Sequence, residues 1–83
     1  MTVSRWRAVA VRNTSGVANE SPLFKECDDA TCYGDILLQA GNWGSYRLEE
    51  VWLLSDAPGA DTTSADIQLR DMKRKQDRPV APV

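Results

Sequence analysis

The segment SRWRAVAVR, residues 4–12, alternates between two kinds of side chain. Trp6 and Ala8 occupy one parity, and Arg5 and Arg7 occupy the other. A period of two is the spacing at which the side chains of a β-strand point to one face. The segment therefore predicts an amphipathic strand, and it is the clearest strand signal in the chain.

The segments that follow favour a loop and then a hairpin. The stretch NTSGVANESP, residues 13–22, is rich in turn-forming residues and predicts a loop. Apolar residues on both sides of DDAT, residues 28–31, predict the two strands of a hairpin with DDAT as its loop. AGNWGS contains Gly41 and Gly44, which accept positive φ, and this predicts a tight connection.

Two later segments fit either a strand or a helix. In YRLEEVWLLSD, residues 46–56, Leu48 and Trp52 share a face at both periods, and we favour a strand because Tyr, Val and Trp suit a pleated surface. In ADIQLRDMKRK, residues 65–75, apolar residues alternate as in a strand, but Thr63 could open a helix. For residues 65–75 the sequence does not decide between a strand and a helix.

The count of four or five short strands predicts a mainly β fold. We expect a small barrel or sandwich of the OB or SH3-like type with extended termini. If residues 46–55 or 65–75 are helical, the class becomes α+β. A length of 83 residues allows one small core. We expect a single domain at residues 1–76 and an extended, basic, proline-containing tail at residues 77–83.

The composition is that of an ordinary globular domain, with 42% apolar and 27% charged residues. The longest uncharged stretch, residues 36–46, is far shorter than the roughly twenty apolar residues that a membrane-spanning helix needs. The N-terminal segment carries arginines within its apolar run, which does not fit a secretory signal. We therefore expect a protein that is made in the cytoplasm and has no membrane partner.

Charge is distributed unevenly along the chain, although the formal net charge is −2. Residues 1–19 carry three bases and no acid, residues 20–61 two bases and nine acids, and residues 62–83 five bases and three acids. Basic ends therefore flank an acidic middle. These charges could pair within one fold, pair between subunits, or stay solvated on the surface.

The two cysteines, Cys27 and Cys32, favour a structural role. A structural zinc site normally has four Cys or His ligands, and the chain has no histidine, so we expect no metal. The C-x₄-C spacing also differs from a C-x-x-C redox motif. In the expected hairpin the two cysteines could face each other and form a disulfide. They could equally stay reduced in the core.

Candidate catalytic groups are few. Histidine, the commonest general base, does not occur in the chain, and no serine or cysteine stands in a recognisable nucleophile motif. The doublets Asp28-Asp29 and Glu49-Glu50 would point to opposite faces of a strand and would not converge on one substrate. We therefore expect a non-enzymatic protein without a cofactor.

Candidate interface residues come from the basic ends of the chain and from one tryptophan. Trp43, which lies close to two glycines, is either an anchor for a partner or a cap over the core. Trp6 and Trp52 lie within strand patterns and are expected in the core. The candidate interface set is Arg5, Arg7, Arg12, Trp43, Lys73, Arg74, Lys75, Arg78, Pro79 and Pro82.

These features favour a structural or interaction subunit that docks into a larger symmetric assembly of protein subunits, including copies of itself. A bacteriophage virion component, such as a head-decoration, connector or tail protein, would suit the small size and the acidity. The alternative is a small binding module, either an acidic inhibitor of a nucleic-acid-handling enzyme or an OB-like nucleic-acid binder. A pI near 4.9 argues against nucleic acid as a partner, because phosphate binding needs a basic face.

Overall fold

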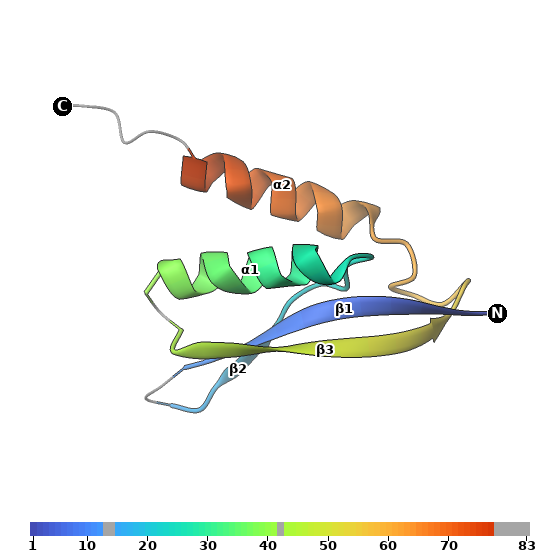
Figure 1. The fold of residues 1–83 in the computed structure, drawn as a ribbon, viewed down its shortest axis with the longest axis horizontal. Helices are drawn as coiled ribbons and strands as arrows, with labels where there is room; N and C mark the ends of the chain where they lie inside the picture. The colour runs from blue at the N-terminus through green and yellow to red at the C-terminus, as the bar shows by residue number, and fades with distance from the viewer. Residues whose placement is uncertain (13–14, 42, 78–83) are drawn as a thin grey trace.

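A computed structural model describes residues 1–12, 15–41 and 43–77 of the chain. In chain order the elements are β1 (Thr2–Val11), β2 (Ala18–Glu20), α1 (Cys27–Gln39), β3 (Ser45–Leu54) and α2 (Thr63–Asp77) (Figure 1). Within the described residues, two helices and one three-stranded antiparallel sheet make the fold α+β. The expected mainly β barrel or sandwich is corrected to the α+β alternative, because residues 65–75 are helical.

The three strands form one antiparallel sheet in the order β2-β1-β3, so β1 is central. β1 and β3 pair without interruption from Thr2 opposite Leu54 to Val11 opposite Ser45. The strands expected from the sequence at residues 4–12 and 46–55 are confirmed in this pair.

The two faces of the sheet differ in what covers them. Residues that pair across antiparallel strands share a face, so even-numbered residues of β1 and β3 lie together. Trp6, Ala8, Tyr46 and Leu48 belong to this set and pack against the core beneath the helices. We call it the helix face, and we call the face of the odd-numbered residues the opposite face.

The hairpin expected around DDAT is wrong, since residues 27–39 form the helix α1. Its buried residues, Ala30, Tyr33 and Gly34, recur at a helical spacing of three and four and face the core. Burial of this stripe against β1 and β3 stabilises the helix (Figure 1).

The residues at the two ends of α1 favour the start of a helix at one end and its termination at the other. Asp28 and Asp29 stand in the first turn, where carboxylates interact favourably with the positive end of the helix dipole. At the other end Gly41 adopts a φ of 86° and donates its N–H to the carbonyl oxygen of Leu38 at 3.0 Å. A left-handed glycine after the last turn satisfies carbonyls that have no partner within the helix.

The helix alternative for residues 65–75 is correct, and α2 begins at Thr63. Asp61 fixes its start, because Oδ1 of Asp61 accepts hydrogen bonds from the backbone N–H of Thr63 at 3.0 Å and from its hydroxyl at 2.7 Å. These bonds stabilise the charged carboxylate and lower the pKa of Asp61. α2 ends at Asp77, and the remainder of the expected tail lies outside the described residues.

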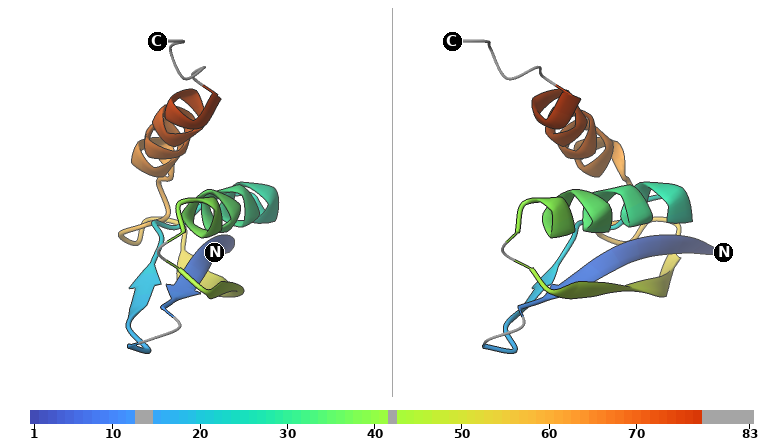
Figure 2. Two further views of the ribbon diagram at one scale, coloured as in Figure 1. Left: turned by 90° about the vertical axis from the view of Figure 1, so that its left-hand side faces the viewer. Right: turned by 60° about the vertical axis from the view of Figure 1, so that its left-hand side comes forward.

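The loop expected at residues 13–22 contains the short strand β2, which pairs with Val9–Val11. Beyond β2 the chain stays beside β1, because Trp6 and Phe24 exchange two backbone hydrogen bonds of 2.8 and 2.7 Å. Figure 2 shows β2 projecting from the sheet on the side away from the helices.

The core lies between the helix face of the sheet and the two helices. α1 covers the sheet, and α2 packs on α1 (Figures 1 and 2). Phe24 and Tyr33 meet with ring centroids 5.8 Å apart, an aromatic contact at the centre of the cluster. The buried members of the cluster are Ala8, Phe24, Ala30, Tyr33, Ala65 and Leu69.

Gly34 allows α1 to approach the sheet closely. A Cβ atom at this position would lie 2.5 Å from Cδ2 of Tyr46 and 2.7 Å from Cγ of the same ring. The Tyr46 ring therefore packs directly on the helix backbone, and its hydroxyl donates a hydrogen bond of 2.8 Å to Oδ1 of Asp35 on the same helix.

Candidate functional site

Arg7 links all three strands through its side chain. Its Nη2 lies 2.7 Å from Oε1 of Glu49 on β3, and its Nη1 lies 3.4 Å from Oε2 of Glu20 on β2. The second oxygen of Glu49 accepts a hydrogen bond of 3.1 Å from Nε of Arg47. Two guanidinium groups thus hold one carboxylate on the opposite face of the sheet.

The pKa of Glu49 is lowered by this arrangement. Hydrogen bonding from Arg7 is the largest cause, and hydrogen bonding from Arg47 adds to it. Both arginines favour the charged form of the carboxyl group. Arg7 of β1 therefore pairs with acidic residues from the middle of the chain, which is one of the charge arrangements that the sequence allowed.

Arg5 also lies on the opposite face and binds a loop. Its Nε and Nη2 donate to the backbone carbonyl of Ala60 at 3.0 and 2.7 Å, and its Nη1 donates to the carbonyl of Ser4 at 2.8 Å. Because Ala60 belongs to the connection between β3 and α2, Arg5 attaches this connection to β1. This structural role was not expected from the sequence.

Arg12 and Trp43 are brought together by the fold. The Arg12 guanidinium carbon lies 5.1 Å from the centroid of the Trp43 ring, a distance that suits a cation–π interaction. Trp43 is half-buried. The tryptophan therefore has an intramolecular partner beside the α1–β3 connection.

The remaining basic candidates are on α2 or beyond it. Lys73, Arg74 and Lys75 are exposed, and Nζ of Lys75 lies 3.5 Å from Oδ2 of Asp71 one turn earlier. Because α2 packs on α1 and not on the sheet, these residues lie apart from the arginines of β1 (Figure 1). The last three candidates, Arg78, Pro79 and Pro82, lie outside the described residues.

The cysteines are both half-buried on α1, and both are free. A separation of five helical residues places Cys27 and Cys32 about 140° apart around the helix axis and about 7.5 Å apart along it. Of the two alternatives for the cysteines, the disulfide depended on a hairpin that does not form, so the geometry it needed is lost.

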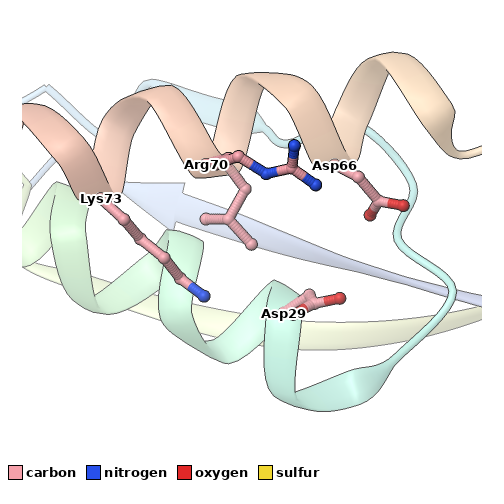
Figure 3. Close-up of a pocket in the computed structure, with 5 residues that line it drawn as sticks. Asp29, Asp66, Arg70 and Lys73 are labelled. Carbon is pink, nitrogen blue, oxygen red and sulfur yellow. The ribbon is translucent and has the colours of Figure 1, made fainter.

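A cleft between α1 and α2 brings together charged residues that the sequence did not single out (Figure 3). Asp29 on α1 and Lys73 on α2 reach into the space between the helices, with Asp66 and Arg70 beside them on α2. The formal charges of the two acids and the two bases sum to zero. The cleft volume of about 260 Å³ is below the roughly 300 Å³ at which ligand pockets begin, so we do not take it as the main site.

The outer edge of β3 is the best candidate for an interaction site. β3 is at the end of the sheet and pairs only with β1 among the described residues. Trp52 and Leu54 are 63% and 59% exposed, respectively, on its helix face. The expectation that Trp52 lies in the core is therefore wrong. The sheet extends beyond the N-terminal end of α1, so the helix does not cover this end of β3 (Figure 1).

A metal site and a membrane-spanning helix find no support in the part of the chain that the structure describes. Residues 1–12, 15–41 and 43–77 contain no group of three His, Cys, Asp or Glu side chains placed to hold a metal ion. Neither α1 nor α2 combines the length and apolar character that crossing a membrane requires.

Comparisons of the chain with protein-family models, with curated proteins and with solved structures found no significant match. The candidate site therefore rests on the geometry of β3 and on its exposed apolar side chains.

Proposed function

We propose that the protein is a non-enzymatic structural or interaction subunit that docks into a larger assembly of protein subunits. The observation that carries the proposal is the open edge of β3, a ten-residue strand with two large exposed apolar side chains. An unpaired strand edge offers backbone donors and acceptors to another chain, and exposed apolar area favours association.

The opposite edge of the sheet contrasts with β3. There the strand β2 has three residues, and the chain beyond it covers β1 through the Trp6–Phe24 pair. Short and covered edges are the usual protection against unwanted pairing. β3 has no such cover among the described residues. Docking of another chain on this edge would explain why Trp52 and Leu54 are exposed there.

The basic termini take a different role from the one expected. Arg5, Arg7 and Arg12 all have intramolecular partners, so we no longer assign them the main contact with other subunits. The exposed bases of α2 and the proline-containing tail remain predicted contacts. The virion setting expected from the sequence also remains a prediction.

The alternative of a small binding module has less support. An OB-like binder depends on a five-stranded barrel, and the described residues form one three-stranded sheet. An acidic inhibitor depends on a continuous acidic surface, whereas Glu20 and Glu49 are both paired with Arg7.

The solution mass of the purified protein, measured by light scattering across a range of concentrations and salt, tests the proposal. Association through the β3 edge should give a discrete oligomer that forms with concentration and resists salt, because backbone and apolar contacts are weakly screened. Dissociation by salt would instead support the basic termini as the contact. A monomer under every condition, without a foreign partner in cell extract, would remove the proposal.

A further inference from the structure

The backbone groups at the open edge of β3 can be assigned from the hydrogen bonds of β1. Trp6 directs both its N–H and its C=O to Phe24, on the side away from β3. Val11 and Met1 accept instead from Gly44 and Ser55, the residues that flank β3. Since these directions alternate along a strand, odd-numbered residues of β1 bond to odd-numbered residues of β3.

Even-numbered residues of β3 therefore direct their N–H and C=O groups away from β1, toward the open edge. The same residues place their side chains on the helix face. The set is Tyr46, Leu48, Glu50, Trp52 and Leu54.

β3 carries charges at Arg47, Glu49 and Glu50, but it lacks three other features that natural edge strands use to prevent pairing, namely proline, lysine and a bulge. Its sequence, SYRLEEVWLL, contains no proline and no lysine. The pairing with β1 runs one residue for one residue from Thr2 to Val11, so no bulge twists the edge away. A long, regular edge with exposed large apolar side chains is a template for another strand.

The strand that fits this edge best is β3 of a second copy. Trp52 and Leu54 on β3 need an apolar partner at the same end of the sheet, and the same residues of another copy supply one. In an antiparallel pair related by a two-fold axis, both copies bury the same surface, which closes the assembly as a dimer.

Charge and the length of the paired stretch together select the register of such a pair. A two-fold axis through Glu49 or Glu50 would place two carboxylates directly opposite each other, which is destabilising. An axis through Leu48 would leave Trp52 and Leu54 beyond the other copy's strand. Axes through Val51, Trp52 or Leu53 oppose no like charges, and the axis through Val51 pairs the longest stretch of β3, residues 48–54. Leu54 then faces Leu48 of the second copy, and Trp52 faces Glu50 and lies diagonal to the second Trp52.

We propose that two copies of the chain join their β3 strands antiparallel across a two-fold axis at Val51, which extends each sheet into one continuous sheet. This inference rests on the proposed function and names its partner and geometry. α1 of each copy covers the end of β3 near Tyr46, away from Trp52. The two helices therefore lie toward opposite ends of the joined strands.

Cross-linking across the axis tests the register. Val51 directs its backbone groups to β1, so the two Val51 residues form a non-hydrogen-bonded pair with Cα atoms about 4.5 Å apart, which is within disulfide range. In a background with Cys27→Ser and Cys32→Ala, Val51→Cys should give a disulfide-linked dimer under mild oxidation. Leu53→Cys is the matched control, because its own symmetry mate lies about 14 Å away along the strand.

A second test, which uses two variants mixed together, does not depend on the Val51→Cys substitution. Position 49 faces position 53 of the second copy in this register. Glu49→Cys and Leu53→Cys should therefore cross-link when mixed and not when each is oxidised alone. Circular dichroism of the reduced variants shows that each is folded before it is oxidised.

The outcomes separate the inference from the proposed function. Cross-linking of Val51→Cys without Leu53→Cys supports the two-fold pair. An oligomeric wild-type chain in which Val51→Cys fails to cross-link, or in which Leu53→Cys cross-links equally well, overturns the inference and leaves the assembly role standing. A wild-type chain that is monomeric alone and with extract overturns both.

Discussion

Gly34 is the residue at which helix propensity and packing oppose each other most clearly. Alanine should favour the helix by roughly 1 kcal/mol relative to glycine. Its Cβ, however, would lie 2.5 Å from the Tyr46 ring, and overpacking of this kind costs about 1–3 kcal/mol. We expect Gly34→Ala to lower the free energy of unfolding, measured by urea denaturation.

The Tyr46 ring provides the control for this effect. If the ring is the obstacle, Gly34→Ala should cost less in a Tyr46→Val background, because valine keeps strand propensity and removes the ring. An equal cost in both backgrounds, or a stabilised single variant, would show that α1 does not approach β3 as described.

The two tyrosines give a pH dependence with a definite sign. Burial raises the pKa of Tyr33, and the hydrogen bond to Asp35 is the main cause that raises the pKa of Tyr46. Because both folded-state values exceed the ordinary value of 10.0, the contribution of the tyrosines to stability is present below pH 10 and is lost as the pH rises through the raised values. Ultraviolet titration should show both phenols ionising above 10 in the folded protein. A tyrosine that titrates at its ordinary value in the native state would disagree.

Trp52 shows why residue burial was hard to anticipate. Its position in a period-two pattern is correct, and it does lie on the helix face with Leu48. The pattern does not show how far the covering helix α1 reaches along the strand. α1 stops short of the C-terminal end of β3, and this end is exposed. Burial depends here on where α1 lies over the sheet, a tertiary property that no local window contains.

At the scale of elements, the cysteines test whether residues 27–39 are helical. A hairpin would bring Cys27 and Cys32 face to face, whereas the helix places them about 140° apart. We expect mild oxidation of the folded protein to leave both thiols free of an intramolecular disulfide, as measured by mass spectrometry after alkylation. Quantitative formation of that disulfide without loss of the native circular dichroism spectrum would argue for the hairpin.

The strands β1 and β3 could be predicted, but β2 and α1 could not, for physical reasons. β1 and β3 each have ten residues, along which the kind of side chain changes with a period of two, so both strands are visible in the sequence. β2 has three residues, and its pairing with β1 defines it more than its own composition. α1 contains Thr31, Gly34 and several aspartates, which are weak helix formers, and burial against the sheet overrides this preference.

At the scale of the whole molecule, part of the candidate site followed from the sequence. The charge pattern of basic ends and an acidic middle allowed three arrangements, and Arg7 provides one of them, pairing within the fold, with Glu20 and Glu49. The same pattern led to a wrong choice of interface residues, because the guanidinium N–H groups of an arginine that pairs within the fold are already used in hydrogen bonds there. The open edge of β3 was missed because edge and centre are properties of strand order, which single segments do not reveal.

The open edge also predicts which change should abolish assembly and leave the subunit folded. The N–H of Glu50 points to the open edge, so Glu50→Pro removes one edge donor and adds a ring there, while the odd-numbered residues keep their bonds to β1. Glu50→Thr is the matched control, because it also removes the hydrogen bond of 2.8 Å from Ser4 but retains the N–H.

The most direct single measurement is the solution mass of the wild-type chain, Glu50→Pro and Glu50→Thr by light scattering at equal concentration, with circular dichroism to confirm that each is folded. We expect the wild type and the threonine variant to be dimers and the proline variant to be a folded monomer. A proline variant with the same oligomeric mass as the wild type would show that β3 is not the docking edge.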